Sequence, residues 1–227
     1  SLLDIAVERA TTVVPAERVW LGAGEQLRSA VSSVEGLLPS RLIVEPSGRD
    51  TLPAVALGMA TILAADPEAV VAVLTADHLI EPVASFGAIL DAGFALAEAT
   101  PSTLVTFGVV PDFPSTGFGY LELGESLSGS ARVVSTFREK PDLPAAEGFL
   151  AAGPSKYLWN SGMFVWRAST LLAAVEAFAP STGALVQRVV SGDVAAWDEI
   201  EKLSIDYGVM EPASVSSTFA VAALPLS

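Results

Sequence analysis

The chain contains no cysteine and few positive charges. Its 227 residues include one histidine, and lysine and arginine together number 12. The absence of cysteine excludes disulfides, zinc–thiolate centres and thiol nucleophiles. The single histidine, His78, excludes a metal site built on a pair of histidines. A chain without cysteine suits a reducing compartment, and we expect a cytoplasmic location.

The charge balance is strongly acidic. Twenty-six acidic residues against 12 basic residues give a formal net charge of −14. Because such a surface repels nucleic-acid polymers and anionic membranes, we expect neither as a partner. A small phosphorylated ligand is compatible with this charge, since a metal ion and a few local cations can neutralise it. With three lysines in the chain, the surroundings of Lys140 become informative.

Long hydrophobic runs are also absent. The longest apolar stretch, AVALGMATILAA, is about half the length of a bilayer-spanning helix and contains glycine and threonine. The first residues lack the basic, apolar and small-residue pattern of a signal peptide. Hydrophobic residues nevertheless make up 51% of the chain, which argues against disorder and allows a substantial core.

Short β-rich runs alternate with Ala- and Leu-rich stretches through the first half of the chain. This alternation predicts an α/β fold with a mostly parallel sheet, helices on both faces, and ligands at the C-terminal ends of the strands. The runs expected to form strands are 18–22, 41–46, 70–77 and 102–110. The expected helices are 2–13, 24–35, 50–65 and 82–99.

After residue 110, Gly- and Pro-rich turns separate the elements, which predicts a mixed second half. Further strands are expected at 119–125, 131–140 and 157–166. Further helices are expected at 144–152, 169–178, 181–190 and 194–202. No internal repeat or low-complexity linker divides the chain, so we predict one three-layer α/β domain over residues 1–227.

Two segments of the first half place polar side chains directly after expected strands. In EPSGRDT, Glu45 and Arg49 follow a strand, and Asp50 or Thr51 can cap the next helix. Two interpretations of this segment are possible at this point. It is either a capped turn with a surface ion pair or a polar cluster that binds a base or ribose. In LTADH, the Asp77 carboxylate can hold Mg²⁺, although a turn or cap role explains it equally well. For His78 we favour a structural hydrogen bond over a role as a base.

Two segments of the second half combine turns with residues that suit a ligand. In STGFGYLEL, Gly117 and Gly119 would let a ligand approach the backbone closely, although turns also use glycine. In FREKPD, Glu139 and Lys140 are adjacent at a strand end. A carboxylate there can accept sugar hydroxyls while an ammonium meets a phosphate. A solvent-facing charge pair is the alternative.

The segment YLWNSGMFVW predicts a buried strand that is interrupted by Asn160, Ser161 and Gly162. An unpaired buried amide costs roughly 1–3 kcal/mol, so either the neighbouring backbone or a ligand must satisfy Asn160. The chain has no P-loop and no convincing covalent nucleophile. The chain instead offers polar groups, one aspartate that can bind a metal ion, and one lysine. This set of residues suits phosphoryl or nucleotidyl transfer, in which positioning and charge neutralisation do most of the work.

Taken in order, EPSGRDTLPAVALGMA, VLTADHLI, VTFGVVPDFPSTGFGYLE, FREKPD, YLWNSGMFVW and SIDYGVME resemble the mannose-1-phosphate guanylyltransferase (GDP-mannose pyrophosphorylase) family. The resemblance implies a Rossmann-like nucleotidyltransferase domain with a nucleotide-side half at about 1–110 and a sugar-side half at about 111–227. It also implies that GTP and mannose 1-phosphate give GDP-mannose and pyrophosphate. The sugar phosphate would attack the α-phosphorus of the Mg²⁺-bound nucleotide without a covalent enzyme intermediate.

The resemblance assigns residues to three roles. The nucleotide-side residues would be Glu45, Arg49 and Thr51. The sugar-binding residues would be Gly119, through its backbone, Glu139 and Asn160. The residues with catalytic roles would be Asp77, as the Mg²⁺ ligand, and Lys140, at the phosphate. In this assignment the mannose satisfies the Asn160 amide.

The chain departs from the family pattern at Asp50, where the family has asparagine, and at Ala76, where it has serine. The family also has a Gly-rich, Arg-containing phosphate loop before the matched region and an aspartate-containing segment after it, so we expect the chain to be part of a longer polypeptide. Two alternatives follow. One is another sugar-1-phosphate nucleotidyltransferase, such as one that makes GDP-heptose, and the other is a catalytically silent subunit that senses nucleotide sugars. The oligomeric state is open, a homodimer included.

Overall fold

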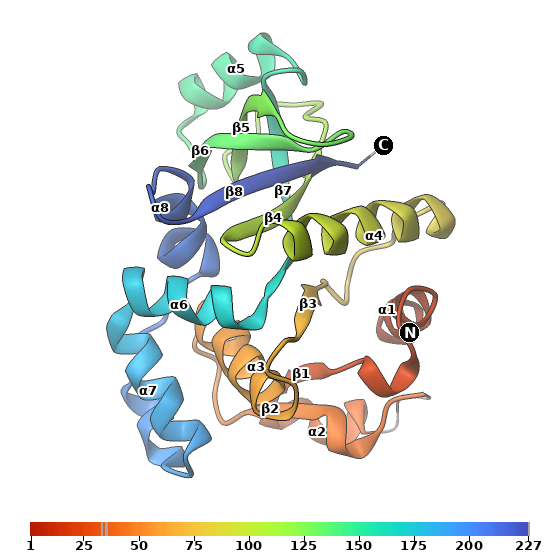
Figure 1. Ribbon diagram of the computed structural model, residues 1–227, viewed down its shortest axis with the longest axis vertical. Coiled ribbons are helices and arrows are strands. Elements are labelled where there is room, and N and C mark those ends of the chain that lie inside the picture. Colours follow the sequence, from red (N-terminus) through yellow and green to blue (C-terminus); the bar gives the residue numbers. More distant parts are fainter. Residues whose placement is uncertain (33, 35, 227) are drawn as a thin grey trace.

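The computed structural model describes residues 1–32, 34 and 36–226. Its main element is a six-stranded sheet with the strand order β3-β7-β4-β8-β6-β5, and β1 and β2 form a separate parallel pair (Figure 1). The strands are β1 (Leu21–Gly24), β2 (Leu42–Glu45), β3 (Val70–Val73), β4 (Thr103–Val109), β5 (Tyr120–Ser126), β6 (Arg132–Arg138), β7 (Tyr157–Arg167) and β8 (Ala220–Pro225).

Helices of very different lengths surround the sheets. The α-helices are α1 (Leu2–Thr11), α2 (Arg28–Val31), α3 (Thr51–Ala65), α4 (Val83–Ala99), α5 (Leu143–Ala152), α6 (Ala168–Phe178), α7 (Pro180–Val190) and α8 (Glu211–Ser214). The short 3₁₀ helices are η1 (Ala16–Arg18), η2 (Glu25–Leu27), η3 (Pro39–Arg41) and η4 (Val194–Glu199), and η5 (Asp206–Met210) is a π-helix. In the described part of the chain, no helix has both the length and the hydropathy that a bilayer crossing requires.

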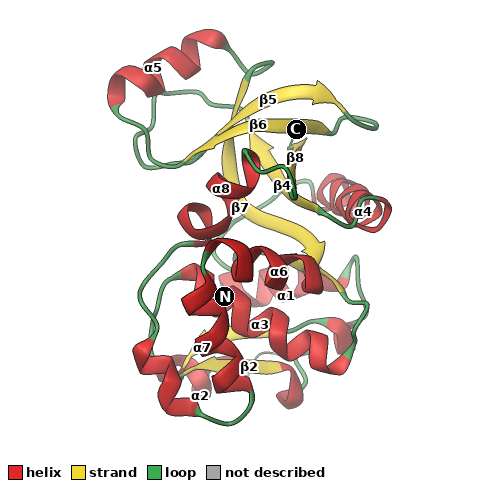
Figure 2. Cartoon of the chain, turned by 60° about the vertical axis from the view of Figure 1, so that its left-hand side comes forward, coloured by secondary structure: helices red, strands yellow, loops and turns green. Residues whose placement is uncertain are grey.

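Helices cover both faces of the six-stranded sheet, which confirms the three-layer arrangement (Figures 1 and 2). Helix α4 packs on one face, against β3, β4 and β7, while α6 and α8 pack on the other. Successive residues of a strand point to opposite faces. In β4, Leu104 therefore packs in the core that also contains residues of α3 and α6, whereas Val105 packs with Phe86 of α4.

The mixed α/β fold is confirmed, but the pairing of neighbouring strands differs from the expectation. Among the described pairs of the six-stranded sheet, β4–β8 is parallel and the others are antiparallel. The strand–helix alternation correctly indicates that β3 and β4 run in the same direction. The long strand β7, from the second half of the chain, lies between them and runs the opposite way.

Several element boundaries also differ. The strand expected at 70–77 ends at Val73, the one expected at 18–22 forms at 21–24, and the helix expected at 194–202 is the 3₁₀ helix η4. The helix expected at 24–35 is reduced to η2 and α2, and its residues 33 and 35 lie outside the described part of the chain. Strand β8 and the π-helix η5 were not predicted.

The polar interruption of YLWNSGMFVW lies where β7 changes partners. Its first residues pair with β5, and its later residues pair with β4 and β3. At this point Gly162 has φ +72°, a left-handed conformation that favours glycine, and Ser161 Oγ accepts from the backbone N–H of Met163 at 3.2 Å. The register to β4 shifts opposite this segment. The interruption is therefore a bend in a buried strand, and it carries Asn160.

Candidate functional site

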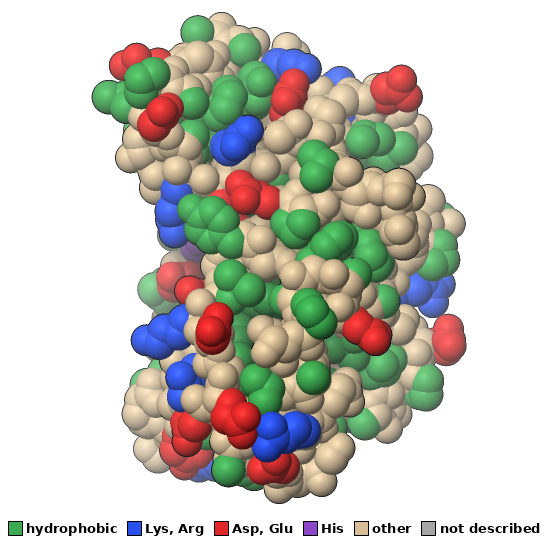
Figure 3. Space-filling model, turned by 90° about the vertical axis from the view of Figure 1, so that its left-hand side faces the viewer, with side chains coloured by type: hydrophobic (Ala, Val, Ile, Leu, Met, Phe, Trp, Pro, Cys, Tyr) green, Lys and Arg blue, Asp and Glu red, His purple; other side chains and the backbone are tan. Residues whose placement is uncertain are grey.

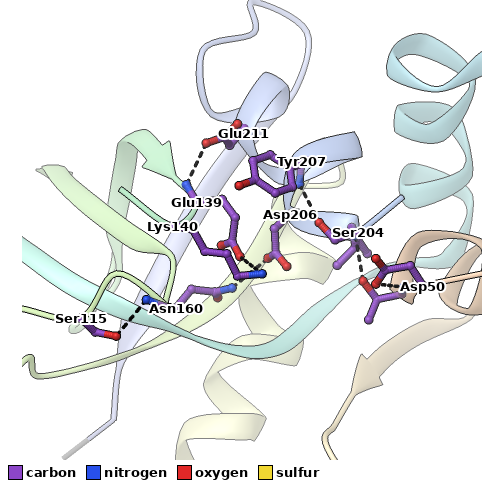
Figure 4. Close-up of polar contacts among 12 residues, drawn as sticks. Asp50, Ser115, Glu139, Lys140, Asn160, Ser204, Asp206, Tyr207 and Glu211 are labelled. Carbon is purple, nitrogen blue, oxygen red and sulfur yellow. Dashed lines mark hydrogen bonds and ion pairs between the residues drawn. The ribbon is translucent and has the colours of Figure 1, made fainter. Parts of the chain in front are cut away.

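Four polar residues from three elements meet beside this bend (Figure 4). Glu139 and Lys140 directly follow β6, Asn160 lies in β7, and Asp206 begins η5. Lys140 Nζ lies 3.5 Å from Glu139 Oε1, and Asn160 Nδ2 donates to Asp206 Oδ1 at 3.0 Å. Glu139, Lys140, Asn160 and Asp206 are called the polar cluster below.

The Asn160 amide has side-chain partners within the protein. Its Oδ1 accepts from Thr106 Oγ1 of β4 at 2.7 Å, and its Nδ2 donates to Asp206. The Asn160 amide is therefore hydrogen-bonded by side chains of the protein, and not by the neighbouring backbone or only by a bound sugar as the sequence suggested. Because an amide has two N–H groups and two lone pairs, one N–H and one lone pair remain available to a substrate.

The cluster contains two carboxyl groups with raised pKa values. Burial, together with the negative charge of Glu139, raises the pKa of Asp206 to about 7. Burial also raises the pKa of Glu139, whereas the neighbouring Lys140 ammonium opposes that shift. Desolvation disfavours a charged carboxylate, and a second carboxylate nearby disfavours it further. The cluster can therefore hold a proton that it loses near neutral pH.

We expect Asp206→Asn to make protein stability less dependent on pH. The folded-state pKa of Asp206 lies above its unfolded value of about 3.8, so its contribution to stability is complete below pH 4 and is lost as pH rises through about 7. Urea unfolding at pH 8 should show the variant to be more stable than the wild type by about 2 kcal/mol. This is less than the roughly 4 kcal/mol of a three-unit shift, because the side chain is partly solvent-accessible.

The same comparison at about pH 3.5, below the unfolded pKa of Asp206, is the control. There Asp206 is mostly uncharged in both the folded and the unfolded wild type, so the unfolding free energies of the two proteins should agree within about 1 kcal/mol. A difference at about pH 3.5 equal to that at pH 8 would contradict the raised pKa of Asp206.

The backbone at Lys140 brings two neighbouring side chains to one side of the sheet. In an extended strand, Glu139 and Lys140 would point to opposite faces. Lys140 instead has φ +44°, which is uncommon for a residue other than glycine, and its N–H donates to the carbonyl of Phe118 at 3.2 Å. The chain therefore bends at this strand end.

Gly119 is a point of close approach, but the group that approaches it is Glu139. A Cβ atom at Gly119 would lie 2.6 Å from Glu139 Oε2 and 3.0 Å from Phe137 Cζ. The Gly119 carbonyl accepts from the backbone N–H of Asn160 at 2.8 Å. Glycine at this position therefore lets the Glu139 carboxylate and the bend of β7 pack together. The other glycine of the segment, Gly117, donates its N–H to Ser115 Oγ at 3.1 Å in a turn.

The turn before α3 has the capped geometry that the sequence predicted. Asp50 is the N-cap residue, and its Oδ1 accepts from the backbone N–H of Thr51 at 2.8 Å. Arg49 forms an ion pair with Asp198, with 3.0 Å between Nη2 and Oδ1. Thr51 Oγ1 accepts from the backbone N–H of Ile205 at 2.9 Å. The cap and an ion pair of Arg49 are therefore present, although the partner Asp198 lies outside the segment, and the ligand-binding role of the turn stays a prediction.

The segment before Asp206 joins this turn to the polar cluster. The backbone N–H of Leu52 donates to the carbonyl of Leu203, and the N–H of Leu203 donates to the carbonyl of Arg49. The charge of Asp50 contributes to the raised pKa of Asp206. Residues 49–52, which include Arg49 and Thr51 of the expected nucleotide side, therefore contact residues 203–205, directly before Asp206 of the polar cluster.

Asp77 lies in an exposed loop after β3. Its side chain is 81% exposed, and its Oδ1 lies 4.0 Å from His78 Nε2. The loop begins beside β7, because a Cβ at Gly162 would lie 3.9 Å from Thr75 Cγ2. The described residues include no cluster of three or more acidic, histidine or cysteine side chains suited to a metal. A Mg²⁺ ion at Asp77 would thus depend on one protein carboxylate together with phosphates and water, a pattern that Mg²⁺ commonly adopts.

Two other predicted residues have more limited contacts. Glu45 is half-buried at the end of β2, where burial raises its pKa. His78 takes part in structural hydrogen bonding through its carbonyl oxygen, which accepts from Arg9 Nη1 at 2.8 Å. No hydrogen bond or ion pair found among the described residues joins Glu45 or Asp77 to the polar cluster.

The sequence reasoning missed three residues of the site. Asp206 and Thr106 hold the Asn160 amide, and Glu211 Oε1 accepts from the backbone N–H of Glu139 at 2.8 Å. Asp206 and Glu211 lie in SIDYGVME, where an acidic residue is surrounded by apolar ones. A buried carboxyl in such a context is a signal that could have identified Asp206.

The face of the molecule shown in Figure 3 is not uniformly charged. On the face shown in Figure 3, acidic and basic side chains lie in small mixed groups with hydrophobic side chains between them. That face therefore shows none of the continuous basic surface that typifies binding of nucleic-acid polymers.

Comparison with known proteins identifies the family. Residues 22–210 match the family model described as nucleotidyl transferase. The chain belongs to this family. The family resemblance derived from the sequence motifs is therefore confirmed, and the chain carries the fold of a family of nucleotidyltransferase enzymes.

Individual relatives agree with this assignment. The xanthan biosynthesis protein XanB of Xanthomonas campestris pv. campestris (strain B100) is 39% identical over 89% of this chain and 43% of its own length. A mannose-1-phosphate guanylyltransferase of Escherichia coli (strain K12) is 37% identical over 77% of this chain and 39% of its own length. The chain thus spans less than half the length of these curated relatives.

A solved structure matches nearly the whole chain. The crystal structure of a protein named mannose-1-phosphate geranyltransferase, from Thermus thermophilus, superposes with a TM-score of 0.86. It is 31% identical, and the match covers 99% of this chain and 63% of that one. The overall arrangement of strands and helices is therefore shared with a solved protein, in agreement with the nucleotidyl transferase fold that the family match indicates.

Proposed function

We propose that the nucleotidyl transferase chain transfers a guanylyl group from GTP to mannose 1-phosphate, giving GDP-mannose and pyrophosphate. The observation that carries the proposal is the polar cluster, in which a lysine lies 3.5 Å from a carboxylate whose side chain is 8% exposed, beside an asparagine with free hydrogen-bonding capacity. A carboxylate and an amide suit sugar hydroxyls, and an adjacent ammonium suits the phosphate of a sugar 1-phosphate. Relatives named mannose-1-phosphate guanylyltransferase support the choice of sugar and base.

In this mechanism the cluster binds and orients the sugar phosphate. The Glu139 carboxylate accepts from sugar hydroxyls, the remaining N–H of Asn160 donates to the sugar, and Lys140 contacts the phosphate. An oxygen of the sugar phosphate then forms a bond to the α-phosphorus of GTP, and the bond from that phosphorus to the leaving pyrophosphate breaks. Positioning and charge neutralisation supply most of the catalysis in such a transfer.

The nucleotide would bind on the side of Glu45, Arg49 and Thr51. The Thr51 hydroxyl accepts from Ile205 and keeps its own hydrogen available for a nucleotide. Asp77 would hold Mg²⁺, which neutralises charge on the phosphates when it is bound. Its exposed carboxylate fits an ion that is otherwise coordinated by phosphates and water.

The direct test measures pyrophosphate release by the full-length protein with Mg²⁺. GTP, ATP, UTP and dTTP are each combined with mannose 1-phosphate and with glucose 1-phosphate, and a heptose 1-phosphate is added for GTP. We expect the pair of GTP and mannose 1-phosphate to have the highest kcat/KM. A clearly higher value for UTP or dTTP with glucose 1-phosphate would overturn the proposed substrates.

A nucleotide-sugar-sensing subunit without turnover is the second candidate. The Asp50 carboxylate favours it, because this residue begins α3 on the nucleotide side and adds a negative charge where the family has a neutral amide. Calorimetric binding of GDP-mannose to a full-length protein that releases no pyrophosphate would favour the sensor. Turnover well above background would exclude it.

A further inference from the structure

Arg9 of α1 is a buried charged residue outside the polar cluster. Its exposed fraction is 2%. Among the buried residues in the described part of the chain, Arg9 is the only charged one. Burial lowers the pKa of its guanidinium, and no ion pair among the described contacts joins it to a carboxylate. Burying a charge without a counter-ion is costly, so the contacts that hold Arg9 are informative.

These contacts reach the loop that carries Asp77. Arg9 Nη1 donates to the carbonyl of His78 at 2.8 Å, and Nη2 donates to the carbonyl of Thr75 at 3.2 Å. The guanidinium carbon also lies 5.5 Å from the centre of the Phe86 ring in α4. Arg9 therefore bridges the two ends of residues 75–78 and is itself held against α4. In the sequence, Asp77 lies between the two residues whose carbonyls Arg9 contacts, and its side chain is exposed.

The geometry of this bridge requires arginine. A planar guanidinium presents several N–H donors in a rigid fork, whereas a lysine ammonium is a single compact donor group on a flexible stem. Two carbonyls three residues apart can be held at once by the fork. Hydrogen bonds from a charged donor are also stronger than those between neutral groups. A neutral apolar residue would fill the same buried volume without holding the loop.

We infer that Arg9 is a positioning residue, whose guanidinium fixes residues 75–78 so that the Asp77 carboxylate is presented to the metal-bound nucleotide. Fixing of the loop follows from the two hydrogen bonds alone. The part that concerns the metal and the nucleotide rests on the proposed function. Arg9 itself touches neither substrate in this account and acts through the backbone of the loop.

The test compares Arg9→Met, Arg9→Lys and a matched control in the full-length protein. Arg132→Met is the control, because Arg132 also donates from two nitrogens to a backbone carbonyl, that of Gly124, but at the opposite end of the sheet from the Asp77 loop. His78 is a direct reporter of the loop, and its ring signal in NMR is assigned by its disappearance in His78→Gln. Thermal melts verify that each variant is folded.

We expect Arg9→Met and Arg9→Lys to shift and broaden the His78 signal, while Arg132→Met leaves it unchanged. We also expect the Mg²⁺ concentration that half-saturates GTP binding to rise about tenfold in both Arg9 variants, since loss of a charge-assisted hydrogen bond commonly has an effect of this size. An unchanged His78 signal in the Arg9 variants, or full restoration of the wild-type signal by Arg9→Lys, would overturn the inference. A shifted His78 signal together with an unchanged Mg²⁺ concentration for half-saturation of GTP binding would also overturn the inference.

Failure of the proposed function gives a different result. In that case the wild type itself shows no Mg²⁺-dependent binding of GTP, whereas the His78 signal still decides whether Arg9 holds the loop. If Arg9→Met does not fold, Arg9→Lys retains the charge and the stem, and the same two measurements on it decide the question.

Discussion

Replacing Asp77 by asparagine is expected to remove most of the turnover of the full-length protein and to leave its fold intact. The side chain is 81% exposed in a loop, and no hydrogen bond among the described residues ties it to the core, so the melting temperature should change little. An asparagine has the same shape but lacks the charge that attracts Mg²⁺. Loss of charge stabilisation by a metal in the transition state should lower kcat by roughly 10²–10⁴-fold.

The matched control is Asp91→Asn, which removes an exposed aspartate from the surface of α4. Steady-state pyrophosphate release should be measured for both variants over a range of Mg²⁺ concentrations. The Asp91 variant should behave as the wild type does at every concentration. Near-normal turnover of the Asp77 variant at saturating Mg²⁺ would rule out Asp77 as a metal ligand.

Local patterns in the sequence predicted many elements and several contacts correctly. The helices α3 and α4 form within one residue of the expected ranges, because caps and apolar composition are local properties. The Asp50 cap and the bend that brings Glu139 and Lys140 together also depend on a few neighbouring residues. The sequence motifs therefore indicated the correct family and placed three members of the polar cluster near one another.

Contacts between distant segments could not be predicted in the same way. Strand β7 lies between β3 and β4 because its apolar faces complete both cores, and no local pattern specifies that neighbour. Asn160 and Asp206 are separated by 46 residues, and Thr51 and Ile205 by 154. The raised pKa of Asp206 arises from this burial and from Glu139, so it becomes visible only once the fold is known.

The second large effect is expected at Lys140, where function and stability should change in different directions. Glycine adopts the left-handed conformation without the strain of roughly 1–2 kcal/mol that a side chain causes there. Lys140→Gly should therefore retain the wild-type melting temperature or raise it. The same substitution removes the ammonium from the polar cluster, so we expect kcat/KM for mannose 1-phosphate to fall by roughly 10²–10³-fold. The affinity for GTP should be nearly unchanged, because the nucleotide is assigned to the side of Arg49 and Thr51.

Lys156→Ala is the matched control for the loss of a lysine. Lys156 Nζ forms an ion pair with Glu122 Oε1 at 2.8 Å, further along the sheet and outside the polar cluster. Removing the Lys156 side chain should therefore leave the affinities for both substrates unchanged. Thermal melts and separate titrations of GTP and mannose 1-phosphate distinguish the outcomes. If Lys140 were only a surface charge paired with Glu139, Lys140→Gly would leave kcat/KM within about twofold of the wild type, since exposed ion pairs contribute little. A combined loss of stability and of affinity for both substrates would instead show that the strained backbone needs its lysine for structural reasons, and Lys140 would lose its assignment to the sugar phosphate.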